Sequence, residues 1–133
     1  MREPLAEFTL TIRTRSSQRG RKKLRVFIWK HVKDLRIAAK KSSERSAHYW
    51  KHAAGAYVGR RDTRQFGEIH LWEKFMGAGY WAHELQHFMM DYFLGTETFP
   101  IDNEANERMA HLAGELTAEF WTKFYERFEV QSG

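Results

Sequence analysis

The sequence predicts a small α+β domain, and three observations support that class. An alternating apolar and polar segment at 7–14 indicates a strand. Two further strand-like segments follow at 56–60 and 66–72, and helical periodicity dominates from residue 80 onwards. The chain has 133 residues, which is typical of a single domain spanning 1–133, and 42% of them are hydrophobic, which favours a packed core over disorder.

The first half of the chain predicts one strand and one helix. Phe8, Leu10 and Ile12 alternate with polar residues, as in a half-buried strand. From residue 21 the apolar residues recur every three or four positions, which predicts a helix of about five turns with a basic outer face. The residues of this stripe are Leu24, Phe27, Ile28, His31, Val32, Leu35 and Ala39. The next stretch, up to Gly55, is ambiguous. It could extend this helix past a break at Ser42 and Ser43 and end at Gly55.

The middle of the chain predicts a β-hairpin followed by a helix. The strand-like segments 56–60 and 66–72 flank the polar sequence RDTRQ, which is typical of a hairpin connection. Gly77 and Gly79 allow a sharp turn before a helix that we expect from Tyr80 to about Phe93, ending near Gly95.

The last predicted helix covers 101–128. Asp102 or Asn103 is expected to cap it, since both side chains accept hydrogen bonds from the first free N–H groups. Its buried stripe is expected to consist of Ala105, Met109, Leu112, Leu116 and Phe120. The predicted order is therefore strand, helix, strand, strand, helix, helix.

Charge is divided unevenly along the chain. Residues 1–64 contain 18 Lys and Arg against 5 Asp and Glu, whereas residues 65–133 contain 4 against 12. The basic half, densest in RSSQRGRKK, is a candidate surface for nucleic acid or an acidic partner, although such runs also occur simply as solvated surface. No apolar run is long enough for a membrane span, the N-terminal sequence lacks the apolar core of a signal peptide, and there is no cysteine. We therefore expect a cytoplasmic protein that would hold any metal by His and carboxylate side chains.

The pentapeptide His-Glu-Leu-Gln-His at 83–87 is the strongest chemical signal. In a helix, His83 and His87 lie one above the other on one face, so both imidazoles can reach a single cation. Glu84 lies about 100° round the helix, where its carboxylate can contact a water on that cation. This spacing predicts a Zn²⁺ site.

A catalytic zinc has three protein ligands, so a third is expected on the neighbouring helix. Glu104 is our first candidate because it lies in the first turn of that helix, 17 residues after His87, and Glu107 is its main competitor. His111 and Glu115 share a helix face with Glu104. A second pair with the same spacing, His48 and His52, lacks a neighbouring carboxylate and is more typical of surface or core histidines.

The sequence HELQH followed by NEANE, after a strand and a glycine-containing loop, resembles the gluzincin metalloproteases. The compact minigluzincins and the ImmA/IrrE-like proteases are the most similar in the order of their elements, over roughly residues 56–115. The resemblance implies a zincin-like domain in which His83, His87 and Glu104 bind zinc and Glu84 acts as general base. It departs from the thermolysin-like pattern at Arg108, where that pattern has an Asp that orients a histidine.

The expected activity is a zinc-dependent peptidase of restricted substrate range. Glu84 would take a proton from water and pass it to the leaving amine, and His111 is our first candidate for stabilising the oxyanion, ahead of Tyr57 or Tyr80. A peptide or protein substrate would add along a sheet edge, for which 66–72 is the plausible strand. The alternative is a nucleic-acid-associated or regulatory binding protein that uses the basic half and has a structural or vestigial zinc site.

Overall fold

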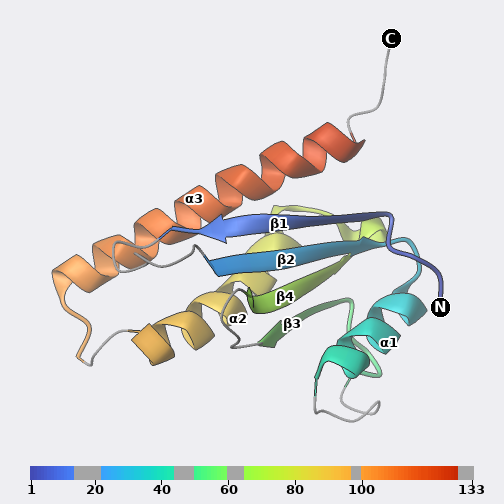
Figure 1. The fold of residues 1–133 in the computed structure, drawn as a ribbon, viewed down its shortest axis with the longest axis horizontal. Coiled ribbons are helices and arrows are strands. Elements are labelled where there is room, and N and C mark those ends of the chain that lie inside the picture. The colour runs from blue at the N-terminus through green and yellow to red at the C-terminus, as the bar shows by residue number, and fades with distance from the viewer. Residues whose placement is uncertain (14–21, 44–49, 60–64, 97–99, 129–133) are drawn as a thin grey trace.

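The structure, a computed structural model, describes residues 1–13, 22–43, 50–59, 65–96 and 100–128 (Figure 1). It contains four strands, a short 3-10 turn and three helices, which confirms the α+β class. The elements are β1 (Ala6–Ile12), β2 (Lys22–Trp29), α1 (Val32–Ser42), β3 (Gly55–Gly59), β4 (Gln65–Trp72), η1 (Glu73–Phe75), α2 (Ala78–Thr96) and α3 (Asn103–Phe128). None of the helices in these ranges is both long enough and apolar enough to cross a membrane.

The strands form one mixed sheet in the order β1-β2-β4-β3. β2 and β4 run parallel, while β1 and β3 pair antiparallel with their neighbours. Apolar side chains of α2 and α3 pack on one face of the sheet, and those of α1 pack on the other. β3 is therefore an edge strand with α2 on one side of it and α1 on the other (Figure 1).

The helix predicted from residue 21 is wrong in its first half, because Lys22–Trp29 is the strand β2. Leu24, Val26 and Ile28 are buried on the face covered by α2 and α3. Phe27 and Trp29 pack on the opposite face. A strand between two others is apolar on both faces, so its period of two is lost and its apolar residues also fit a helical spacing. The true helix, α1, begins only at Val32 and ends at Ser42.

The hairpin is confirmed by antiparallel pairing from Gly55 with Leu71 to Gly59 with Gly67, while its turn at 60–64 lies outside the described residues. The expectation that 66–72 forms the sheet edge is wrong. β4 lies between β2 and β3, and β3 is the edge. Any peptide that adds to this end of the sheet must therefore pair with β3.

The two C-terminal helices agree closely with the predictions. Asp102 caps α3, since its Oδ1 accepts a hydrogen bond from the backbone N–H of Ala105 at 2.8 Å. The predicted stripe of α3 is buried except for Met109, which is only partly buried. α3 packs against the side of α2 that carries Trp81, whose ring stacks on Phe120 with centroids 4.0 Å apart.

Candidate metal centre

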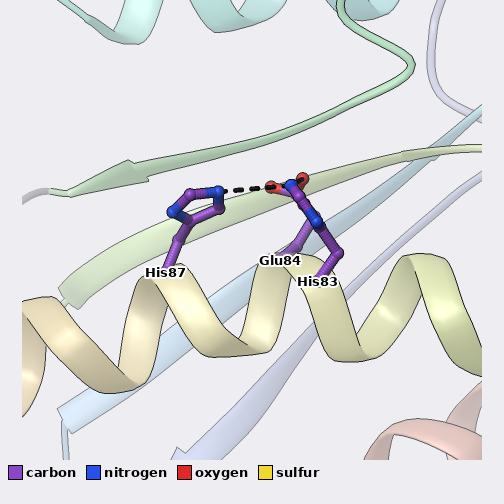
Figure 2. Close-up of side chains that lie close together, drawn as sticks. All are labelled: His83, Glu84 and His87. Carbon is purple, nitrogen blue, oxygen red and sulfur yellow. Dashed lines mark hydrogen bonds and ion pairs between the residues drawn. The ribbon is translucent and has the colours of Figure 1, made fainter.

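Helix α2 brings His83 and His87 together on one exposed face. Their Nε2 atoms lie 3.3 Å apart (Figure 2). Two ligands at 2.0–2.1 Å from a tetrahedral zinc are separated by about 3.3 Å, the edge of a tetrahedron of that size. The pair is therefore already spaced to hold one metal ion.

Glu84 lies beside the pair but is buried, with 5% of its surface exposed. Its Oε1 is 3.8 Å from His83 Nε2, while its Oε2 has no hydrogen-bond partner among the described residues. Burial raises the pKa of the Glu84 carboxyl to about 7. A buried oxygen without a partner is costly, so this carboxylate is poised for a water or another ligand that the protein itself does not supply.

Glycines in β3 allow α2 to lie this close to the edge strand. A Cβ at Gly55 would lie 3.3 Å from Glu84 Oε1, and one at Gly59 would lie only 2.7 Å from Asp91 Oδ2. Between these glycines, the Tyr57 hydroxyl donates a hydrogen bond to Asp91 Oδ2 at 2.7 Å. The sequence GAYVG therefore fixes the distance between the edge strand and the metal-binding face of α2.

The histidines open into a cavity of about 420 Å³ between α2, β3 and the turn that precedes β3. Its walls are formed by Trp50, His52, Ala53, Gly55, Ala56, Tyr57, His83, Glu84, His87 and Asp91. Of the tyrosines proposed from the sequence, Tyr57 lines this cavity, whereas Tyr80 stacks on Phe75 and is not part of its lining. Sequence reasoning missed Asp91, although it lies one turn beyond His87 on the same helix face.

The predicted residues of α3 are not brought to the histidine pair. Among the described residues, the group of possible ligands whose atoms all lie within 4.8 Å of one another comprises His83, Glu84 and His87. Glu104, Glu107, His111 and Glu115 are exposed on α3 and lie outside this group. His111 instead lies 3.9 Å from Glu107 in an exposed pair.

The packing of α2 against α3 explains this separation. Trp81 Nε1 donates a hydrogen bond to Thr117 Oγ1 at 3.0 Å, so Trp81 marks the side of α2 that faces α3. At 100° per residue, His83 and His87 lie about 160° and 120° away from Trp81 round the helix. The histidines consequently face away from α3, and Glu104 as third ligand and His111 as oxyanion stabiliser stay predictions.

A second cluster of histidine and glutamate lies on the opposite face of the sheet. His70 and Glu68 of β4 are almost completely buried, and His70 Nε2 lies 3.1 Å from Glu68 Oε1. Trp29 Nε1 donates a hydrogen bond to His70 Nδ1 at 3.0 Å, so Nε2 must carry the proton that bonds to Glu68. Phe27 stacks on the imidazole at 4.7 Å between ring centroids. Both ring nitrogens of His70 are therefore engaged.

The donor set on α2 could hold a divalent metal ion, because imidazole and carboxylate groups are typical ligands of such ions. The basic stretch proposed for nucleic acid and His48 lie largely or wholly outside the described residues, at 14–21 and 44–49. No protein-family model matches the chain, and neither the curated proteins nor the solved structures contain a significant match. The function is therefore argued from the residues of this cavity.

Proposed function

We propose that the protein is a zinc-dependent peptidase whose site is the cavity between α2 and β3. The observation that carries the proposal is the buried Oε2 of Glu84, which has no partner in the described part of the chain, beside two imidazoles at chelating distance. A helix that only needed to pack would have no reason to bury a carboxylate with an unsatisfied oxygen. The gluzincin resemblance of HELQH supports the same assignment.

The two histidines and the glutamate of the motif have two roles, metal binding and proton transfer. His83 and His87 hold the metal through Nε2. A bound zinc ion lowers the pKa of a water and polarises a carbonyl group. Glu84 accepts the proton of the attacking water on its unpartnered oxygen and later gives it to the leaving amine.

The third protein ligand is proposed to come from α3, with Glu104 first and Glu107 second. Both side chains are exposed, so either can exchange water for a metal without breaking a buried contact. Because they lie outside the ligand group and the histidines face away from α3, this ligation would require α2 and α3 to change their relative position when metal binds. Zinc affinity of Glu104→Ala and Glu107→Ala, measured side by side, distinguishes them, since only loss of the true ligand lowers it strongly.

The proposed substrate is an extended peptide or protein segment that pairs with β3. β3 is an edge strand, and its residues Gly55, Ala56 and Tyr57 line the cavity. A peptide added to this edge by backbone hydrogen bonds would place a peptide bond over the histidine pair. The supporting argument is that the outermost strand of the described sheet lies beside the motif helix.

The test is hydrolysis of a mixture of quenched fluorescent peptides by the zinc-loaded protein and by Glu84→Gln. We expect the variant to lose about 10²- to 10⁴-fold in kcat, the range for removing a general base, while it keeps its zinc. Glu126→Gln, an exposed glutamate on α3, is the matched control and should retain activity. Equal rates for the protein and Glu84→Gln, or no hydrolysis by the zinc-loaded protein, would rule out the peptidase.

A further inference from the structure

We propose that His52 is a further catalytic residue, which donates a hydrogen bond to the carbonyl oxygen of the scissile peptide as that oxygen becomes negative. This inference rests on the proposed peptidase function and adds a residue that the HELQH motif does not contain. His52 would have the oxyanion-stabilising role for which His111 was the first candidate from the sequence.

His52 belongs to a turn that is firmly attached to the rest of the protein. The turn is closed by a hydrogen bond from Ala53 N–H to the Trp50 carbonyl at 3.1 Å. Arg36 of α1 donates to the Ala53 carbonyl at 3.0 Å, and Trp50 Nε1 donates to Ser43 Oγ at 3.0 Å. Trp50 itself is buried against α1 and β3. The position of His52 is therefore fixed by contacts on both sides of it.

His52 lines the same cavity as His83, Glu84 and His87, yet it does not belong to the group of ligand atoms within 4.8 Å of one another. It thus lies on the wall formed by the turn, while the histidine pair lies on the wall formed by α2. A substrate paired with β3 would pass between these walls. This is where a residue must lie to contact the substrate without binding the metal.

The other donors in the cavity lining are already engaged. The Tyr57 hydroxyl donates to Asp91, and the Trp50 indole donates to Ser43. His83 and His87 are assigned to the metal. The exposed ring of His52 makes no hydrogen bond or ion pair with any residue in the described ranges. Its N–H group is therefore the side-chain donor in the lining that remains for a substrate.

The reaction needs such a donor at one defined moment. The water oxygen forms a bond to the carbonyl carbon, the π electron pair moves to the carbonyl oxygen, and the water proton passes to Glu84. A hydrogen bond from His52 stabilises the oxyanion at this stage. The electron pair on the oxyanion then re-forms the C=O bond as the C–N bond breaks, the C–N electron pair leaves with the nitrogen, and that nitrogen takes the proton from Glu84. His52 keeps its own proton throughout.

The experiment compares His52→Ala and His52→Gln with the zinc-loaded protein, using the quenched peptide mixture and a zinc titration. Removing one oxyanion donor typically costs about 10²- to 10³-fold in kcat, so we expect that loss in His52→Ala with KM changed less than about threefold. Zinc affinity should be unchanged. His52→Gln retains an N–H donor and should recover part of the lost kcat. Lys51→Ala, an exposed residue of the same turn, is the control and should behave like the unmodified protein.

Each remaining outcome overturns the assignment. If kcat of His52→Ala is unchanged while Glu84→Gln is inactive, the peptidase stands and His52 has no role. If zinc affinity falls together with kcat, His52 is a metal ligand and not an oxyanion donor. If the zinc-loaded protein hydrolyses nothing, the proposed function itself fails, and the assignment of His52 fails with it.

Discussion

Two clusters of glutamate and histidine lie on opposite faces of one sheet and differ in how their polar atoms are satisfied. On β4, His70 bonds to Trp29 and Glu68, and the second oxygen of Glu68 lies 3.9 Å from Arg25 Nη1. On α2, the two histidines are exposed and the second oxygen of Glu84 has no partner among the described residues. The β4 cluster is closed, and the α2 cluster is open.

Both clusters contain histidine and glutamate, so residue type alone does not tell a structural cluster from a candidate ligand site. The hydrogen-bond partners of their polar atoms do. Buried polar groups in native proteins are nearly always paired, because an unpaired group loses its hydration without compensation. The closed cluster meets that condition within the chain and needs no ligand. In the open cluster, Glu84 Oε2 has no partner among the described residues, which is the physical reason for proposing a metal site on α2.

The largest expected effect on stability comes from breaking the closed cluster. His70→Ala removes a hydrogen-bond partner of both Glu68 and Trp29 and leaves the buried Glu68 carboxylate with Arg25 Nη1 at 3.9 Å from its other oxygen. Losing one partner of a buried pair typically costs about 4 kcal/mol. Urea denaturation should show a loss of this size, while zinc binding by the folded variant is unchanged. A loss below about 1 kcal/mol would mean that the network is not a structural element.

Burial of the Glu84 carboxylate in the open cluster should make the free energy of unfolding of the metal-free protein depend on pH. The pKa of Glu84 is about 7 in the folded state and 4.5 in the unfolded state, so the folded state binds more protons between these values. The free energy of unfolding should therefore fall as pH rises from about 5 to 8, by up to about 3 kcal/mol. Urea denaturation in a chelator, repeated on Glu84→Gln, measures this. The variant should lack this fall, and an identical pH profile would show that Glu84 is not penalised by burial.

A smaller effect is expected from Trp29→Phe, which keeps an aromatic ring but removes the N–H that donates to His70. Leaving the buried Nδ1 acceptor unsatisfied should cost about 1–2 kcal/mol, less than His70→Ala because Glu68 keeps its partner. Thermal and urea denaturation check the ranking of the two variants. If Trp29→Phe is the more destabilising of the two, packing of the Trp29 indole contributes more to stability than the hydrogen bonds of His70.

The smallest effect is expected at His111, which is on the protein surface. Its contact with Glu107 is 3.9 Å long, and both side chains are more than 70% exposed. Exposed pairs of this kind contribute little, so His111→Ala should change the free energy of unfolding by less than about 0.5 kcal/mol. A larger change would contradict the exposed position of His111 and indicate that its side chain makes a stabilising contact.

The sequence predicted the features that depend on local geometry. The spacing of His83 and His87, the cap at Asp102 and the pairing of the 55–72 hairpin follow from helix periodicity and turn chemistry. β2 was missed because a strand that is apolar on both faces loses its alternation. The strand 66–72 was wrongly expected at the sheet edge because a hairpin does not show which of its two strands pairs with the rest of the sheet. In the order β1-β2-β4-β3, it is β4 that does so.

The rest of the site depends on packing between distant elements, and sequence spacing does not fix it. Whether Glu104 faces the histidines depends on which side of α2 meets α3, and the stacking of Trp81 on Phe120 decides that. His52 reaches the cavity because Arg36 and Trp50 hold its turn against α1. The only sequence signal for His52 was its spacing from His48, a residue outside the described ranges, and that spacing gives no information about the cavity.

The most direct test of the central claim is the zinc content and affinity of the purified protein beside those of His83→Ala and His87→Ala, with His31→Ala as the control. The account predicts about one zinc per chain, strongly weakened in either α2 variant and unchanged in the control. A folded protein that binds no stoichiometric zinc, or that binds it equally well without His83, would contradict the assignment of a metal centre to α2.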